Sequence, residues 1–154
     1  MEQASDKKSL YMTVLMTPDM ANFSGKVHGG TLLKLLDQVA YSCASRYCGT
    51  YVVTLSVDRV LFRDAIQVGE LVSFTATVNF TGRTSLEVGI RVETENIRDG
   101  SRRHTNSSFF TMVAVDEDGQ PVPVPELVPA NDHERDRWEA AAARRSALRS
   151  AFID

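Results

Sequence analysis

The sequence predicts an α+β fold in which an antiparallel sheet carries helices on one face, and two observations lead to this prediction. The spacing of apolar residues is close to 3.6 between residues 30 and 47, and close to 2 from residue 51 to about 116. Turn-rich segments separate the period-2 runs, which predicts connections of hairpin length between the strands. We expect one domain over residues 1–130, because 154 residues suffice to bury a core.

The N-terminal part of the chain predicts a strand, a turn region and the main helix, in that order. SLYMTVLM (9–16) is rich in aromatic and aliphatic side chains, and TPDMANFSGKVHGG (17–30) carries Pro, Asp, Asn, Ser and three glycines. The helix follows over about 30–47, with Gly49 at the position of a C-cap. Its length of about 26 Å would allow a sheet to curl around it.

The rest of the chain predicts four strands, a linker and a second helix. Hairpin signals lie in VGE, FTGRTS and RDGSRR, and the strands are expected at 51–62, 70–80, 83–97 and 103–116. Residues 116–132 hold four of the five prolines and cannot form a central strand, so they are interpreted as a linker. A polar helix rich in Ala and Arg is expected over 132–151, within a C-terminal tail of residues 131–154.

Composition excludes several classes of partner. The net charge is −3 with both signs scattered along the chain, which argues against nucleic acid or an anionic membrane as the main partner. No apolar run reaches 18 residues, so no transmembrane helix is expected. Cys43 and Cys48 have no companions at zinc-site spacing and are interpreted as reduced thiols of a cytoplasmic protein.

One acid, Asp37, lies in the middle of the apolar helix. A projection at about 100° per residue places it at the margin of the apolar face, between Lys34 and an edge formed by Leu33 and Ala44. It could be a rim residue that pairs with Lys34. Alternatively, it is a carboxylate held against apolar surface, where it could act as a general base or nucleophile.

The Gly-Gly pair at the start of this helix favours a functional role for Asp37. Backbone N–H groups at a helix N-terminus are unpaired and carry the positive end of the helix dipole. Gly29 and Gly30 would let a ligand approach these groups closely, so they could stabilise an oxyanion on a carbonyl. Such donors and a carboxylate two turns later are the parts that hydrolysis of an acyl group needs.

Four segments resemble one known family. They are PDMANFSGKVHGGTLLKLLDQVAYSCASRY, VDRVLFRDAIQVGE, TGRTSLEVGIRVE and SSFFTMVAVDEDGQPVPVPELVP, and together they cover roughly residues 10–130. The sequence is similar to hotdog-fold acyl-CoA thioesterases, in the branch of the cytosolic (brain-type) acyl-CoA hydrolases and their single-domain bacterial relatives.

The resemblance implies a single hotdog domain, a curved antiparallel sheet of five to six strands wrapped around a long central helix, plus the C-terminal helix. In this family two protomers pair edge to edge, and three such dimers often form a hexamer with active sites at the dimer interface. The implied reaction is hydrolysis of fatty acyl-CoA to free fatty acid and CoA in cytoplasmic fatty acid metabolism. No metal or organic cofactor is expected beyond the CoA of the substrate.

The resemblance also implies roles for particular residues. Asp37 matches the catalytic acid and Asn22 the catalytic Asn, which would reach Asp37 from the partner chain. His28, Gly29 and Gly30 match the turn that receives the thioester carbonyl. The CoA-contacting strand region corresponds to Arg83, Thr84 and Ser85.

Several assignments stay open at this stage. Arg63 fits either an ion pair with Asp64 or a contact with CoA, and Arg103 fits either a solvated turn or a CoA phosphate. His28 fits a positioning role better than direct chemistry, although it is the residue here that titrates near neutral pH. Two other functions remain as alternatives. They are a hydratase or dehydratase using His28 with Asp37, and a non-enzymatic acyl-CoA sensor.

Overall fold

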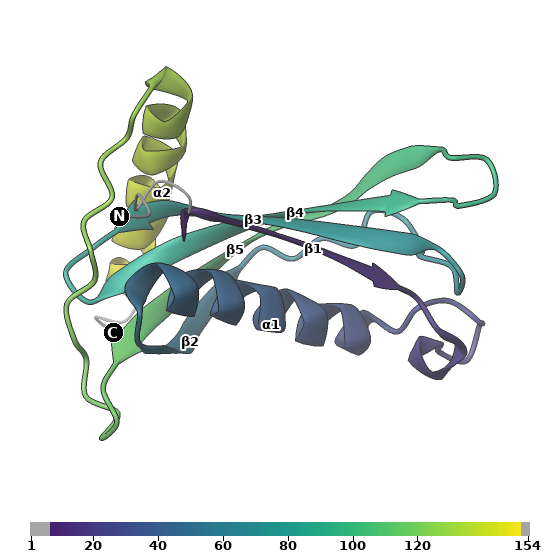
Figure 1. Ribbon diagram of the computed structural model, residues 1–154, viewed down its shortest axis with the longest axis horizontal. Coiled ribbons are helices and arrows are strands. Elements are labelled where there is room, and N and C mark those ends of the chain that lie inside the picture. The colour runs from purple at the N-terminus through teal and green to yellow at the C-terminus, as the bar shows by residue number, and fades with distance from the viewer. Residues whose placement is uncertain (1–6, 152–154) are drawn as a thin grey trace.

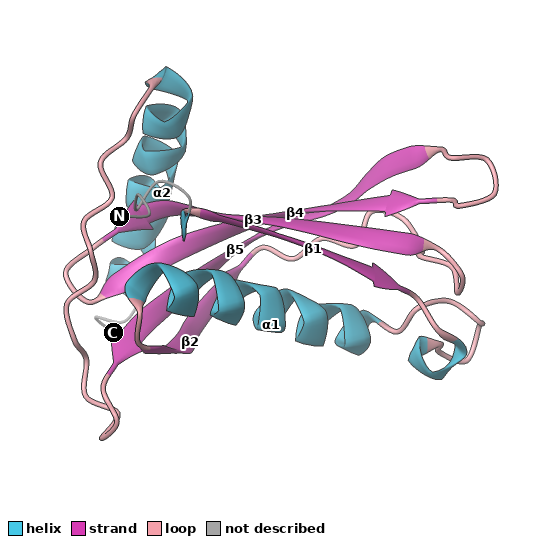
Figure 2. Ribbon diagram, in the orientation of Figure 1, coloured by secondary structure: helices cyan, strands magenta, loops and turns pink. Residues whose placement is uncertain are grey.

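A five-stranded antiparallel sheet and two long helices make up residues 7–151, which are the residues that the computed structural model describes (Figures 1 and 2). The sheet order is β1-β3-β4-β5-β2, so β1 and β2 are its edges. The elements in chain order are β1 (Ser9–Leu15), the 3-10 turn η2 (Pro18–Met20), α1 (Gly29–Cys48), β2 (Tyr51–Asp58), β3 (Leu71–Thr81), β4 (Ser85–Glu95), β5 (Arg102–Val115) and α2 (Asp132–Ala151).

The core lies between α1 and the face of the sheet that α1 covers (Figure 1). The apolar side of α1 and the alternate residues of β3, β4 and β5 are fully buried together, including Leu36, Val39, Phe74, Val88 and Phe110. The apolar face of the helix, with its period of 3.6 residues, thus packs on the apolar face of the sheet, with its period of 2. This is the packing that the two periods in the sequence predict. The predicted α+β class is confirmed.

The helix α1 begins and ends within one residue of the predicted limits of 30 and 47. His28 is its N-cap, with extended backbone angles. Gly49 ends it in the left-handed region, with φ of 71°, and the Gly49 N–H donates to the carbonyl of Ser45. A residue with a Cβ would be strained there, so the C-cap assigned to Gly49 is confirmed.

The strand expected over 51–62 is wrong in its last third, and the hairpin expected at VGE is wrong as well. β2 ends at Asp58, and Arg59 follows with a positive φ of 51°. β2 pairs with β5, while β3 lies between β1 and β4 at the other side of the sheet. Residues 59–70 therefore cross over the sheet rather than turn back on β2, and we call them the crossover segment. The other two hairpins and the remaining strand limits agree within two residues.

The two helices lie on opposite faces of the sheet, not on one face as expected (Figure 1). In β4, Leu86 and Val88 join the core with α1, while Glu87 between them accepts two hydrogen bonds from Arg144 of α2. Because successive residues of a strand point to opposite faces, α2 covers the outer face. Trp138 packs on Phe80 there, with ring centroids 5.0 Å apart.

The proline-rich segment before α2 is ordered against the end of the sheet. The Val124 N–H donates to the carbonyl of Arg83, and the Leu127 N–H donates to Oγ1 of Thr81. The expected C-terminal tail extends to residue 154, and its last three residues lie outside the described range. Neither long helix within residues 7–151 is apolar enough over sufficient length to cross a membrane.

Candidate active site

The N-terminal end of α1 presents one backbone donor rather than the two that the sequence predicts. Nδ1 of His28 accepts a hydrogen bond from the Gly30 N–H at 3.0 Å, which caps the helix. A Cβ at Gly30 would lie 3.2 Å from that nitrogen, so a glycine permits the close approach. Among the described residues the Gly29 N–H has no acceptor, and it is the donor left for a ligand. His28 is thus the residue that caps α1.

Asn22 holds the turn that precedes α1. Its Oδ1 accepts hydrogen bonds from the Ser24 N–H, the Ser24 hydroxyl and the Lys26 N–H, at 2.9 to 3.1 Å. The oxygen is therefore committed to the turn. Within residues 7–151 the side-chain NH2 makes no hydrogen bond, so Asn22 can offer a donor to a carbonyl or to a water.

Asn22 and Gly29 line the same hollow, of about 410 Å³, at the start of α1. Its other wall is the crossover segment, which contributes Phe62, Asp64 and Ile66. A Cβ at Gly29 would lie 3.8 Å from the Phe62 ring, so this wall lies close to Gly29. The structure therefore brings together the Asn22 amide and one helix-terminal donor.

Asp37 lies further along α1 beside a second hollow, of about 520 Å³, between α1, β1 and β2. Its Oδ1 accepts a hydrogen bond of 2.7 Å from the hydroxyl of Thr54 in β2. The side chain is exposed, and so are Leu33 (40%) and Tyr41 (39%), one turn before and after it. The projection placed Asp37 and Leu33 too close to the buried face, because the sheet covers a narrower part of α1 than the apolar pattern suggests.

Asn22 and Asp37 do not meet within one protomer. They line different hollows, and Gly29 is separated from Asp37 by about 12 Å of helix rise at 1.5 Å per residue. His28 and Asp37 likewise have separate partners, and no hydrogen bond joins them in the part of the chain that the structure describes. The acid–histidine pair that a hydratase would need is therefore not formed in one chain.

The expected CoA contacts lie far from the start of α1. Arg83, Thr84 and Ser85 lie at the β3–β4 hairpin, near the C-terminal end of α1 (Figure 1). Ser85 is buried, while Arg83 is exposed. Arg63 is exposed on the crossover segment, and among residues 7–151 it forms no ion pair with Asp64. The ion pair expected between these neighbours is thus not observed.

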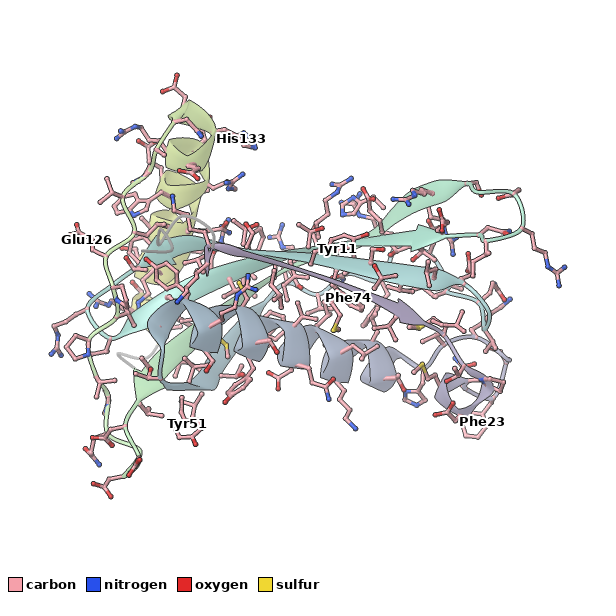
Figure 3. All side chains as sticks on the ribbon, viewed as in Figure 1. Tyr11, Phe23, Tyr51, Phe74, Glu126 and His133 are labelled. Atoms are coloured by element: carbon pink, nitrogen blue, oxygen red, sulfur yellow. The ribbon has the colours of Figure 1, made fainter. Side chains whose placement is uncertain are left out.

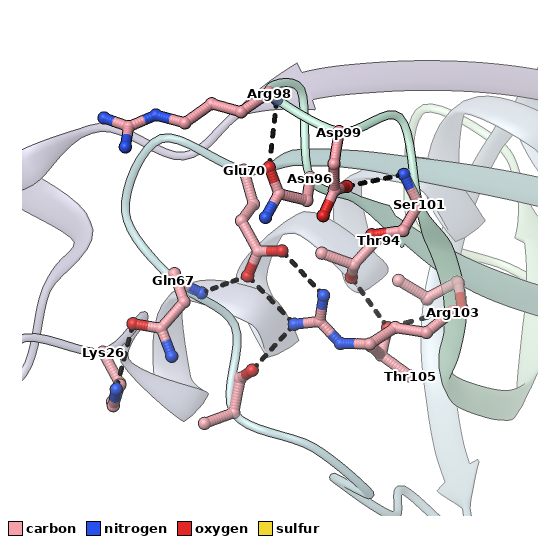
Figure 4. A network of polar contacts seen from close by, with 12 residues as sticks. Lys26, Gln67, Glu70, Thr94, Asn96, Arg98, Asp99, Ser101, Arg103 and Thr105 are labelled. Atoms are coloured by element: carbon pink, nitrogen blue, oxygen red, sulfur yellow. Dashed lines mark hydrogen bonds and ion pairs between the residues drawn. The ribbon is translucent and has the colours of Figure 1, made fainter.

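Sequence reasoning missed Thr54 and the pairing of Arg103. Thr54 is a polar residue in a strand of mostly apolar ones, and this is the one signal that could have singled it out. Arg103 does not lie on a solvated turn, because its guanidinium binds both oxygens of Glu70 at 2.6 and 2.9 Å (Figure 4). These hydrogen bonds lower the pKa of the Glu70 carboxyl, although burial opposes this by raising it.

The two cysteines take no part in this site. Both are free, and burial raises the pKa of each thiol to about 11. A thiol with so high a pKa contains little nucleophilic thiolate at neutral pH. Neither cysteine forms a disulfide among the described residues, and the high pKa of both thiols argues against a cysteine nucleophile.

Comparison with known proteins places these features in a family. The model of the thioesterase superfamily matches residues 24–101. Protein VdlD of Helicobacter pylori is 49% identical over 149 residues, which cover 97% of this chain and 85% of that protein. The cytosolic acyl coenzyme A thioester hydrolase of Rattus norvegicus is 37% identical over 132 residues. That match covers 84% of this chain but only 35% of the rat protein.

Solved structures share the whole architecture. An apo-hexameric acyl-CoA thioesterase has a TM-score of 0.89 and 37% identity, covering 97% of this chain and 96% of that one. The acyl-CoA hydrolase of Staphylococcus aureus, in complex with butyryl coenzyme A, coenzyme A and coenzyme A disulfide, has a TM-score of 0.87 and 28% identity. Here 96% and 90% of the two chains are covered.

An antiparallel sheet wrapped around one long helix, with relatives and structural neighbours named as acyl-CoA thioesterases or hydrolases, defines a hotdog-fold enzyme class. The family match covers half of the chain, and VdlD and the hexameric thioesterase match nearly all of it. The chain belongs to the thioesterase superfamily.

Three variants of the S. aureus hydrolase bear on the candidate residues. Each replaces one residue by Ala, and the residues replaced are an Asp, an Asn and a Thr. In that protein the Asn precedes the Asp by 15 residues and the Thr follows it by 17 residues. Asn22, Asp37 and Thr54 have the same two spacings in this chain.

Proposed function

We propose that this protein hydrolyses fatty acyl-CoA to a free fatty acid and CoA. One observation carries the proposal: Asn22 and Gly29 line one hollow at the start of α1, and the exposed carboxylate of Asp37 is held by Thr54. The names of the relatives and structural neighbours support CoA thioesters as the substrate class. The two shared spacings with the residues substituted in the S. aureus enzyme support the choice of Asn22, Asp37 and Thr54.

The proposed reaction places the thioester carbonyl at the start of α1. The Gly29 N–H and the NH2 group of Asn22 donate to the carbonyl oxygen, which stabilises the charge that develops on it. Asp37 either removes a proton from the attacking water or attacks the carbonyl carbon itself, to give a mixed anhydride that water then cleaves. The C–S bond breaks, and the CoA thiolate leaves and takes up a proton. A thiolate leaves readily, so the reaction requires no metal or organic cofactor.

A complete site needs two protomers. In the proposed homodimer the β2 edges pair into one continuous sheet, and Asn22 of one chain meets Asp37 of the other. The free edge of β2 supports this arrangement, because it exposes Tyr51 (63%), Val53 (50%) and Leu55 (43%). The second chain would also supply the Arg83–Ser85 hairpin for CoA, and Arg63 is proposed as a further CoA contact. A trimer of such dimers is proposed from the hexameric neighbour.

Cytoplasmic location is part of the same proposal. The rat relative is named as a cytosolic hydrolase, and the two reduced thiols fit that compartment.

The experiment is a thiol-release assay over acetyl- to palmitoyl-CoA with the wild type, Asp37→Asn and Asn22→Ala. We expect Asp37→Asn to lower kcat by at least about a hundredfold, since removal of one catalytic group has effects of this order. Asp118→Asn, which changes an exposed turn acid, is the matched control and should retain full activity. Near-normal turnover by folded Asp37→Asn would show the proposed site to be wrong. Release of thiol also separates hydrolysis from hydration, which leaves the thioester intact.

A further inference from the structure

The crossover segment, residues 59–70, is fastened to β5 by side-chain and backbone hydrogen bonds. Nδ2 of the fully buried Asn106 donates to the carbonyl of Leu61 at 2.7 Å, and the Arg63 N–H donates to the carbonyl of Thr105 at 3.3 Å. A connection that leaves an edge strand has no ladder of its own, so its backbone groups need such partners.

Arg103 makes the strongest of these attachments (Figure 4). Its guanidinium forms two hydrogen bonds with the carboxylate of Glu70 and a third, of 2.9 Å, with the carbonyl of Ala65. Oε1 of Glu70 also accepts the Gln67 N–H at 2.7 Å. Glu70 is only 7% exposed, and paired charges bound through two parallel hydrogen bonds are among the strongest polar contacts in proteins. The pair therefore fixes both the middle and the end of the crossover segment.

The opposite side of the crossover segment holds the Asn22 turn. The Val27 N–H donates to the carbonyl of Ile66 at 2.8 Å, and Nζ of Lys26 donates to Oε1 of Gln67 at 3.0 Å. Lys26 is also the residue whose N–H binds Oδ1 of Asn22. Hydrogen bonds, joined through the covalent structure of residues 65–67 and Lys26, thus connect Arg103 to Oδ1 of Asn22.

We propose that Arg103 and Glu70 are positioning residues for thioester hydrolysis. Their ion pair holds the crossover segment in place, and the crossover segment in turn holds Asn22 and the wall beside Gly29 at the thioester carbonyl. This inference rests on the proposed function, because it assigns its effect to that reaction. Neither residue lines the hollow that contains Asn22 and Gly29, so both act through other groups.

A neighbouring ion pair provides a matched control. Arg102 lies next to Arg103 in β5 and binds Glu95 of β4 at 3.1 Å. This pair is more exposed than the Arg103–Glu70 pair, and it joins two adjacent strands without a contact to residues 59–70. If the Arg103–Glu70 pair only stabilises the fold, variants of the two pairs should differ in melting temperature but not in kcat or KM.

The experiment compares Arg103→Gln, Arg103→Lys and Glu70→Gln with Arg102→Gln, all in the full chain. Thiol release gives kcat and KM well below the melting temperature, and amide hydrogen exchange is followed in peptides that cover residues 59–70. We expect Arg103→Gln and Glu70→Gln to lower kcat at least about tenfold, since small misplacements of reacting groups have effects of this order or more. KM should change less than about threefold, and exchange of the crossover amides should become faster.

Arg103→Lys keeps the charge but cannot form the forked pair together with the Ala65 contact. We expect its kcat to lie between the wild type and Arg103→Gln, and this variant decides the matter if Arg103→Gln does not fold. Arg102→Gln should match the wild type in kcat and in exchange of residues 59–70.

Two results would overturn the proposal: kcat within about twofold of the wild type despite faster crossover exchange, or a lower kcat with unchanged exchange. Asp37→Asn is measured in the same assay, so that failure of the positioning role can be told apart from failure of the proposed function. If Asp37→Asn is inactive and the Arg103 variants are fully active, the positioning role alone fails. If Asp37→Asn keeps its activity, the proposed function fails whatever the Arg103 variants do.

Discussion

At Asp37, the hydrogen bond from Thr54 fixes Oδ1, and Oδ2 has no hydrogen-bond partner among residues 7–151. An exposed carboxylate would otherwise sample several rotamers, and only some of them would point at the substrate. A hydroxyl on the neighbouring strand is thus a simple way to orient a carboxylate on the surface of a helix. It does so without adding a charge.

This geometry predicts the behaviour of Thr54→Val, which keeps the shape of the side chain but removes the donor. A hydrogen bond to a charged group contributes about 1.5–3 kcal/mol, so we expect kcat to fall by roughly ten- to a hundredfold. Thr54→Ser restores the hydroxyl and should recover most of the activity. Steady-state kinetics of the two variants tests this, and a Thr54→Val enzyme with wild-type kcat would show that Thr54 does not orient Asp37.

At the residue scale, local sequence was sufficient to predict some residues of the candidate site but not the others. Asp37, Gly29 and His28 belong to one continuous segment, so spacing and helix geometry related them to one another. Thr54 is 17 residues from Asp37, and Arg103 is 33 residues from Glu70. Contacts of this kind depend on which strands become neighbours. A single sequence does not contain that information.

At the scale of elements, the same limit explains the errors in the fold. A period of 2 predicts four of the five strands, and composition predicts the fifth, at residues 9–16. Neither signal gives the order of the strands, so the sequence wrongly predicts strand and hairpin within the crossover segment. The pattern also could not show that β4 is covered on both faces. Glu87 is an acid within a run of buried residues in β4, and Arg144 on α2 supplies its counter-charge.

The attachment of α2 leads to a prediction about stability. Glu87 is 5% exposed and accepts hydrogen bonds from Arg144 and from Asn79, while Arg144 also stacks on the Phe109 ring at 3.6 Å. Arg144→Leu would leave a buried carboxylate without its counter-charge. Because Arg144 keeps a quarter of its side chain exposed, we expect a loss of about 2–4 kcal/mol in the free energy of unfolding, somewhat less than for a fully buried pair.

Urea denaturation at one fixed protein concentration measures this loss, because assembly would make the apparent stability depend on concentration. Arg135→Leu, an exposed change on the same helix, should stay within about 0.5 kcal/mol of the wild type. Adding Glu87→Gln to Arg144→Leu removes the stranded charge and should recover part of the stability. Equal losses for Arg144→Leu and Arg135→Leu would contradict the role given to the pair.

At the scale of the whole molecule, one protomer has the parts of a site without their assembly. The donors lie at the start of α1, the carboxylate lies further along it, and the β3–β4 hairpin proposed to contact CoA lies at the opposite end of the sheet (Figure 1). Phe23, next to Asn22, is fully exposed and points away from the rest of the chain (Figure 3). Together with the apolar β2 edge, it leaves a surface that pairing with a second copy would cover.

A mixing experiment tests whether the site is shared between chains. Asn22→Ala and Asp37→Asn are each expected to be inactive as homodimers, because every site then lacks one group. In a mixed dimer, one site carries both changes and the other carries neither, since it takes Asn22 from the Asp37→Asn chain and Asp37 from the Asn22→Ala chain. Random exchange makes half of the dimers mixed, and each mixed dimer has one intact site of two.

Unfolding and refolding the two variants together should therefore restore about a quarter of the wild-type rate of thiol release. Each variant refolded alone is the control, and size-exclusion chromatography verifies that all samples assemble alike. If both groups acted within one chain, no mixture would contain an intact site and no activity would return. Recovery near a quarter would identify the dimer as the smallest unit that carries out the reaction, since an inactive chain regains turnover only through what its partner supplies.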